Sequence, residues 1–147
     1  MSDESQSMTT DYDVTVRNAH GVLSVYKLHV LSKTPWTLQL EDSRSEKFTT
    51  TGFDAFDALK KLRVLLEESG STILCNGSRI EAFPSPMSRS MGGGVLAYIH
   101  KFGEPASRSS LVNIFESATL DQLGTVAQQD DFHKKWKGYF KDQWKKS

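Results

Sequence analysis

Hydrophobic and polar residues alternate along the first third of this chain, with the period of two that is typical of strands with one buried face. The alternation begins at Tyr12 and covers residues 12–18, 22–32, 36–41 and 46–51. The links between these runs are short and polar or contain proline, and links of this length join neighbouring antiparallel strands. The sequence therefore predicts a meander of up to four strands.

The period changes to that of a helix over residues 53–70. Five hydrophobic residues fall on one stripe of this helix: Phe56, Leu59, Leu62, Leu65 and Leu66. Asp54 is the expected N-cap, and Gly70 supplies the expected C-terminal stop. The stripe is wide enough for the helix to lie across a sheet.

Short β-rich runs and a long helix make up the remainder of the chain. A strand within residues 71–80 is expected to enter a type I′ turn at Asn76-Gly77. Two further strands are expected within residues 94–102 and 110–117, and from about Thr119 the pattern is helical. The aromatic residues of this last segment share one face, which we expect to cover the core: Phe132, Trp136, Tyr139, Phe140 and Trp144.

Together these elements predict an α+β fold. A chain of 147 residues suits one domain, which we expect over residues 11–147. We expect an antiparallel, twisted sheet of six or seven strands, one helix packed on a face, and a C-terminal helical segment that closes the core or an edge. Residues 1–10 are rich in Ser, Thr, Asp and Glu, and we expect them to form a disordered tail.

Composition and charge narrow the classes of function. Hydrophobic residues make up 37% of the chain and charged residues 24%, which is typical of a soluble protein. Lys and Arg number 18, as do Asp and Glu, and this balance argues against a dedicated nucleic-acid-binding protein. The N-terminus lacks the features of a signal peptide, and no run approaches the roughly 18 apolar residues of a membrane helix. We therefore expect a cytoplasmic protein without membrane insertion.

The reactive side chains do not form a catalytic or metal-binding set. The single cysteine, Cys75, excludes an internal disulfide and every multi-cysteine metal site. With His29 or His100 it would make a nucleophile and a base, but it falls in an apolar strand, where a buried thiol is the commoner explanation. The four histidines lack metal-ligand spacing. We therefore expect no catalytic residue, no metal and no cofactor.

Residues 76–94 are expected to form a long loop with the features of a binding site. The glycines after Met91 are not followed by Gly-Lys-Ser/Thr and do not fit the dinucleotide fingerprint, so this is not a nucleotide-binding loop. Arg79 and Arg89 offer two guanidinium groups that bind carboxylates or phosphates. The alternative is that both are solvated or paired with carboxylates of the first helix. Loops of this length are uncommon unless they bind or gate something. The candidate binding residues are Asn76, Arg79, Met87, Arg89, Met91, Gly92 and Gly93.

The middle of the chain resembles a group of small uncharacterised bacterial proteins. The resemblance spans roughly residues 52–116 and rests on the helix "FDAFDALKKLRVLLEESG", the segments "ILCNGSR" and "PSPMSRSMGGG", and the strands "LAY" and "VNIF". No activity is known for the group, so the resemblance implies no catalytic residue. It singles out as positions to test Asn76, Arg79, Met87, Met91 and Gly92.

Three hypotheses of function follow, and the missing catalytic set makes an enzyme the less favoured class. The first is a small cytosolic protein-binding module, of adaptor or immunity type, that uses the 76–94 loop. Arg79 and Arg89 would then contact an acidic patch, and Met87 and Met91 would supply adaptable apolar contacts. The second is an enzyme or ligand-binding protein that clamps a small anionic molecule with the two arginines. The third is a nucleic-acid-binding protein that uses the basic, aromatic C-terminal helix. A concave pocket beneath the loop would favour a ligand, and a flat apolar patch would favour a protein partner.

Overall fold

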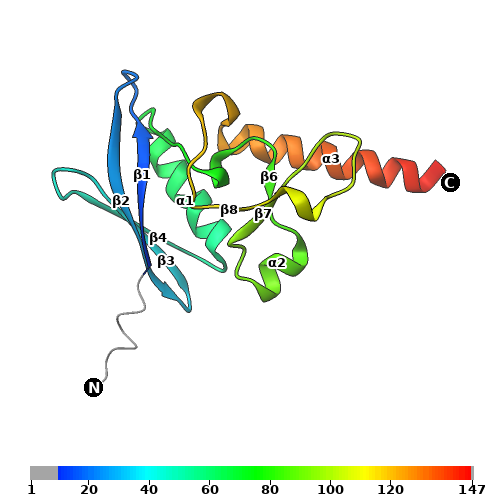
Figure 1. Ribbon diagram of the computed structural model, residues 1–147, viewed down its shortest axis with the longest axis horizontal. Helices are drawn as coiled ribbons and strands as arrows, with labels where there is room; N and C mark the ends of the chain where they lie inside the picture. Colours follow the sequence, from blue (N-terminus) through cyan, green and yellow to red (C-terminus); the bar gives the residue numbers. More distant parts are fainter. Residues whose placement is uncertain (1–9, 147) are drawn as a thin grey trace.

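The computed structural model describes residues 10–146, with side chains as far as residue 141. The predicted disordered tail over residues 1–10 therefore lies outside the described residues except for Thr10, which begins the first strand. The side chain of Trp144 also lies outside them. The described chain forms a single compact α+β unit, as predicted (Figure 1).

A five-stranded antiparallel sheet forms one side of the molecule (Figure 1). The predicted meander is confirmed, and its strands are β1 (Thr10–Arg17), β2 (Leu23–Lys33), β3 (Trp36–Glu41) and β4 (Lys47–Gly52). A two-residue strand, β5 (Thr72–Ile73), pairs with β1 and gives the order β4-β3-β2-β1-β5. The side chains that the alternation assigns to one face, such as Leu28 and Leu38, are fully buried.

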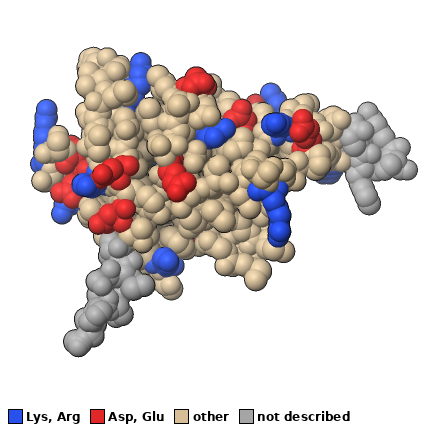
Figure 2. Space-filling view, viewed as in Figure 1, with Lys and Arg blue, Asp and Glu red and all other residues tan. Residues whose placement is uncertain are grey.

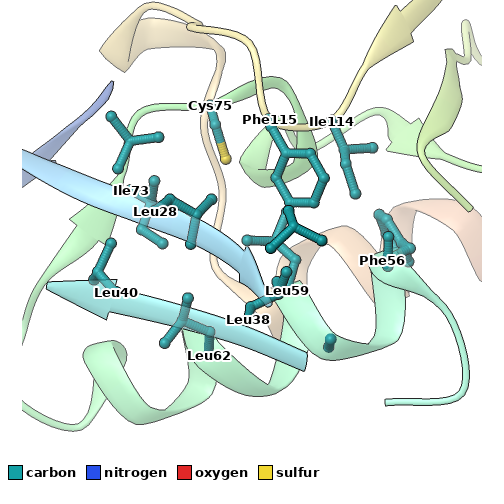
Figure 3. Close-up of a cluster of buried hydrophobic side chains, with 14 of the residues drawn as sticks. Leu28, Leu38, Leu40, Phe56, Leu59, Leu62, Ile73, Cys75, Ile114 and Phe115 are labelled. Carbon is teal, nitrogen blue, oxygen red and sulfur yellow. The ribbon is translucent and has the colours of Figure 1, made fainter. Parts of the chain in front are cut away.

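Helix α1 (Ala55–Glu67) packs on the inner face of this sheet, as its hydrophobic stripe predicts. Asp54 caps it by accepting a hydrogen bond from the Asp57 amide at 2.7 Å. One position of the stripe is wrong, because Leu65 is 42% exposed and Arg63 is buried in its place. Figure 3 shows apolar side chains of the sheet and of α1 pointing toward one another, with Cys75 at one end of the cluster.

The guanidinium group of Arg63 satisfies three buried or half-buried acceptors behind α1. Its Nη1 atom donates to the carbonyl of Gly77 at 3.0 Å and to Oε1 of Gln129 at 2.7 Å, and its Nη2 atom donates to the carbonyl of Gly124 at 3.0 Å. Burial lowers the pKa of Arg63. The side chain therefore joins α1 to three segments that lie far away in the sequence.

The predicted sheet of six or seven strands is not confirmed. Eight strands form in the described chain, but three of them make a separate sheet of β6 (Ala82–Phe83), β7 (Leu96–Ile99) and β8 (Leu111–Asn113). The strand expected within residues 71–80 stops early because the chain turns into a buried 3-10 helix, η2 (Asn76–Ser78). The expected type I′ turn is therefore wrong. Glycine is required at position 77 for another reason, since a Cβ atom there would collide with Leu59 of α1.

The predicted long loop over residues 76–94 is also wrong, because η2, β6 and a short helix, α2 (Pro86–Met91), fill it. Ser85 caps α2 by accepting from the Ser88 amide at 3.0 Å, and Pro86 occupies the first turn, where its missing N–H costs nothing. Two more 3-10 turns, η3 (Arg108–Ser110) and η4 (Leu120–Gln122), precede the last helix, α3 (Val126–Lys146). The predicted C-terminal helix is thus confirmed, and its last part projects from the body (Figure 1). The expectation that its aromatic face covers the core is wrong for the described side chains, because those of Phe132, Trp136, Tyr139 and Phe140 are only half-buried and lie outside the core cluster.

Basic and acidic side chains are interspersed over the face that Figure 2 draws, in keeping with the zero formal charge. No helix within residues 10–146 is both long enough and apolar enough to cross a membrane.

Candidate functional site

Two hollows lie on either side of α2. The first, which we call the cavity, has a volume of about 350 Å³ and lies between α2, the β6–β7 sheet and α3; its lining residues are Phe83, Pro84, Ser85, Pro86, Arg89, Tyr98, His100, Ala106, His133, Trp136 and Lys137. The second, the groove, has a volume of about 520 Å³ and is lined by Ser85, Met87, Ser88, Met91, Gly92, Leu96, Tyr98, Arg108 and Leu111. Ser85 and Tyr98 line both, so the two hollows adjoin.

The side chains of the cavity come from elements that are far apart in the sequence. His100 directly follows β7, and its backbone amide donates to the carbonyl of Glu81 at 3.0 Å. His133 and Trp136 lie three residues apart on α3 and therefore project from the same side of the helix. The indole Nε1 atom of Trp136 donates to the carbonyl of Glu104 at 2.8 Å, which fixes the ring over the cavity.

Flat rings form one wall of the cavity. The rings of Phe83 and His133 stack with centroids 3.7 Å apart and planes 7° from parallel. His100 lies 4.0 Å from the ring of Trp136 and 5.5 Å from that of His133, measured between centroids. This wall offers several aromatic faces to a planar molecule.

His100 is only 4% exposed, yet neither ring nitrogen has a hydrogen-bond partner among the described residues. Nδ1 of His133 also lacks one. Buried polar side chains are nearly always hydrogen-bonded, and unpaired ones call for an explanation such as an ion or a ligand. These nitrogens have almost no exposed surface themselves, so a molecule in the cavity can satisfy them only when the rings of the wall turn.

Burial disfavours the protonated form of both histidines. Burial lowers the pKa of His100, and the backbone of Phe83 opposes this without making a hydrogen bond of good geometry. Burial, together with the neighbouring His100, Lys137 and Arg89, lowers the pKa of His133 to about 4, while Asp130 opposes the shift. The groups facing His133 are therefore mainly cationic.

Arg89 lines the cavity, but its charge already has a partner. Its Nε atom lies 2.7 Å from Oδ2 of Asp54, which is 1% exposed, and its Nη2 atom lies 3.4 Å from Oδ1. The guanidinium also covers the ring of Phe53, with 4.8 Å between its Cζ atom and the centroid. The sequence left open whether this arginine pairs with a carboxylate at the first helix, and the structure shows that it does.

The other predicted binding residues do not converge on one point. The Nδ2 atom of Asn76 donates to the carbonyl of Asn113 at 3.1 Å, within a buried turn. Arg79 lies at the end of that turn and lines neither hollow. The amides of Gly92 and Gly94 both donate to the carbonyl of Ser88, so they are not free to cradle an anion. Arg79 and Arg89 therefore do not line a common pocket.

Gly93 has a structural reason for its place in the chain. It adopts a φ of +69°, and its carbonyl accepts from the Ala55 amide at 2.7 Å. A Cβ atom at this position would collide with the indole of Trp36. The turn that carries Gly93 thus fastens the end of α2 to the start of α1.

Met87 and Met91 are 69% and 81% exposed and line the groove. Leu96, which is 45% exposed, lies beside them in its lining. Exposed apolar side chains that gather around a depression mark a binding surface. These two predicted residues therefore remain candidates.

Cys75 and His29 lie outside both hollows. Cys75 is fully buried, and burial raises the pKa of its thiol. Nδ1 of His29 lies 2.7 Å from Asp11, and its Nε2 lies 3.2 Å from Glu41, on the outer face of the sheet. No group of three or more His, Cys, Asp or Glu side chains among the described residues is arranged to hold a metal ion.

His133 and His29 lie in different surroundings, and they should therefore affect stability in opposite ways as the pH changes. The unfolded chain binds a proton at His133 near pH 6.5, and the folded chain binds it only near pH 4. His133 therefore costs stability as the pH falls from 6.5 toward 4. His133→Phe keeps a ring stacked on Phe83 but cannot bind the proton. Its free energy of unfolding relative to that of the wild type should therefore rise by about 1 kcal/mol between pH 6.5 and about pH 5, a value that allows for the partial exposure of His133. Urea unfolding at several pH values measures this.

His29 provides the matched comparison, because the hydrogen bonds that its protonated ring donates to Asp11 and Glu41 raise its pKa. Its contribution to stability is present below pH 6.5 and is lost as the pH rises through the raised value. His29→Gln should therefore be most destabilising at low pH. A slope of the same sign for both variants would contradict the assignment of their environments.

The comparison of this chain with protein-family models, and with curated proteins, found no match. The proposal of function therefore depends on the geometry described above.

Proposed function

We propose that the protein binds a small, planar, anionic molecule in the cavity. The observation that carries the proposal is His100, a buried side chain in the cavity wall whose ring nitrogens both lack a hydrogen-bond partner in the part of the chain that the structure describes. The volume, about 350 Å³, falls within the range of small-molecule sites, which combine apolar walls with a few polar groups. This is the second hypothesis from the sequence, but of its two arginines only Arg89 lies in the cavity wall, where it is paired with Asp54.

The shape of the wall supports a planar ligand. The rings of His133 and Trp136 lie 16° from parallel, and the ring of Phe83 stacks on that of His133. A flat aromatic or conjugated molecule gains stacking contacts on such faces, which a branched aliphatic molecule does not.

The charges around the cavity support an anion over a cation. Lys137 lies in the lining, where Arg89 is already paired with Asp54, and the described lining contains no carboxylate. A carboxylate or phosphate entering the cavity would accept hydrogen bonds from Lys137 and from a histidine N–H.

Titration of the folded protein with aromatic acids tests the proposal, with benzoate as the first probe and acetate and benzamide as matched compounds. We expect benzoate to shift the ¹⁵N resonances of the His100 and His133 rings at millimolar concentration. Acetate lacks the ring and benzamide lacks the charge, so both should bind at least several-fold more weakly.

Two variants separate the cavity from the rest of the surface. Trp136→Ala should weaken benzoate binding by at least tenfold, because it removes the stacking face. Met87→Ser with Met91→Ser changes only the groove and should leave the affinity unchanged. Equal responses to benzoate and benzamide, or the absence of ring shifts with every acid, would rule out an anion site in the cavity.

The groove supports a second candidate function, the binding of another protein. Met87 and Met91 project from α2 with most of their surface exposed, and thioether side chains adapt to varied apolar partners. Arg108 in the lining offers a positive charge to an acidic patch. This candidate keeps the first hypothesis from the sequence but replaces Arg79 and Arg89 by Arg108.

A further inference from the structure

A second surface, independent of the cavity, lies at the other end of the molecule's main sheet. Strand β4 is its terminal strand, and on its outer side it pairs with no other strand of the described chain. Every second residue of such a strand directs an unpaired N–H and C=O outward. Apart from its pairing with β3, the backbone of residues 47–51 makes no hydrogen bond to the backbone of another described residue.

Native edge strands are commonly shielded by charges, proline, bulges or a covering segment. The middle of β4 has none of these, since it consists of Thr49, Thr50 and Thr51 and pairs with β3 in an unbroken register. The opposite edge of the sheet differs: β5 has only two residues, and the following residue, Leu74, donates to Thr15 and accepts from Ala118. Within residues 10–146, β4 is thus the edge that is open to another strand.

A hollow of about 550 Å³ runs beside this edge, between β4 and α1; it is lined by Thr50, Thr51, Asp57, Lys60, Lys61, Val64 and Leu65. Val64 and Leu65 are 43% and 42% exposed. These two residues lie outside the core cluster although they belong to a buried amphipathic helix. An additional strand next to β4 would cover their apolar surface.

We propose that an extended, acidic peptide segment of a partner protein pairs with β4 as a further strand of the sheet. Its backbone would satisfy the outward N–H and C=O groups of β4, and alternate side chains would pack against Val64 and Leu65 of α1. A strand held between a sheet edge and a helix is an established mode of peptide recognition.

The lining charges favour an acidic segment. Lys60 and Lys61 outnumber Asp57 in the lining of the hollow. Lys61 lies 3.2 Å from Asp57, and Lys60 lies 2.9 Å from Asp130 of α3, outside the lining. Both ion pairs are partly exposed, so an acidic segment can compete for the two lysines. The same charges disfavour a second copy of this chain. In a two-fold pairing of β4 with β4, both α1 helices would lie on one face of the joined sheet, and their lysines would face each other across the joint.

The test selects 12-residue peptides from a phage-displayed random library on the full-length protein, with the variant Leu65→Asp used to remove peptides that bind elsewhere. Leu65 is exposed, so the substitution should leave the fold intact, which circular dichroism and urea unfolding verify. We expect enriched peptides that alternate apolar with other residues and carry Asp or Glu. Lys61→Glu should weaken their binding by at least tenfold, and Lys135→Glu on α3 should not.

Backbone pairing is tested on the peptide, which leaves the protein unchanged. Two synthetic copies of an enriched peptide carry N-methyl groups on odd or on even residues. In one copy the methyl groups block the bonds to β4, so that copy should lose binding at least tenfold more than the other. The proposal is overturned if no peptide is enriched on the wild type relative to Leu65→Asp. It is also overturned if the two methylated copies bind equally well. If the wild type sediments as a dimer and Leu65→Asp sediments as a monomer, the proposal is overturned, and β4 pairs with a second copy of this chain.

Discussion

Replacing Arg63 by methionine should lower the free energy of unfolding by about 2–4 kcal/mol, because the hydrogen bonds that it donates are buried. Gly77 would keep the hydrogen bond from Nε2 of Gln129, at 2.8 Å, but the carbonyl of Gly124 and Oε1 of Gln129 would lose the partners described above. Each buried acceptor without a partner costs about 1–3 kcal/mol, and removal of the buried charge recovers part of that. Urea unfolding followed by circular dichroism measures the change.

Two variants make this prediction specific. Arg63→Lys keeps the charge but replaces the fork of donors by a single ammonium group, which cannot serve three acceptors in fixed directions. We expect it to recover less than half of the loss. Lys61→Met, on the exposed side of the same helix, should change stability by less than about 0.5 kcal/mol. Equal effects of Arg63→Met and Lys61→Met would contradict the network.

Arg63 also shows why part of the fold was beyond the reach of sequence reasoning. The helix was predictable from its apolar repeat, and its N-cap from Asp54, since both signals are local. Arg63 occupies a position on the buried side, where a charged residue is not expected. Its acceptors belong to residues 77, 124 and 129, and no local pattern identifies partners at that separation.

The second sheet was mispredicted for a related reason. The meander has strands of six to eleven residues, which are long enough for the alternation of hydrophobic and polar residues to be recognised in the sequence. Strands β5 and β6 have two residues each and β8 has three, so their pairing is set by tertiary contacts and not by a pattern of their own. The buried turn at Asn76-Gly77 is likewise set by packing against α1.

The candidate site was predictable only in pieces. The sequence drew attention to Met87, Arg89 and Met91, which do line the two hollows, but it placed them on a loop with Arg79. It missed the cavity because His100 approaches Trp136 only when β7 and α3 pack together. The spacing of His133 and Trp136 on a helix was the one local signal available, and it indicates a shared face without indicating what that face contacts.

The pair formed by Asp54 and Arg89 should have the other large effect on stability. Arg89→Met would leave a carboxylate that is 1% exposed without its charged partner and should cost about 3–5 kcal/mol. Asp54→Asn retains an oxygen to cap α1 but leaves the guanidinium unpaired, and should cost about 2–4 kcal/mol. Because each single variant leaves one unpaired buried group, the double variant should be more stable than the sum of the two losses implies, by about 2–3 kcal/mol.

A double-mutant cycle measured by urea unfolding gives this coupling energy. The exposed pair of Lys135 and Asp131, 3.0 Å apart on α3, provides a matched cycle with an expected coupling below about 0.5 kcal/mol. Losses that simply add at Asp54 and Arg89 would mean that the ion pair does not hold α2 in place.

The same cycle separates the structural role of Arg89 from its place in the cavity wall. Asp54→Asn with Arg89→Met removes both charges of the pair, so neither is left buried without a partner, but it also removes a cation from the lining. If the cavity binds an anion, the double variant should recover part of its stability while its affinity for benzoate remains low. If stability and affinity recover together, Arg89 acts on the cavity only by holding α2 against the start of α1, and Lys137 is left as the cation that attracts the ligand.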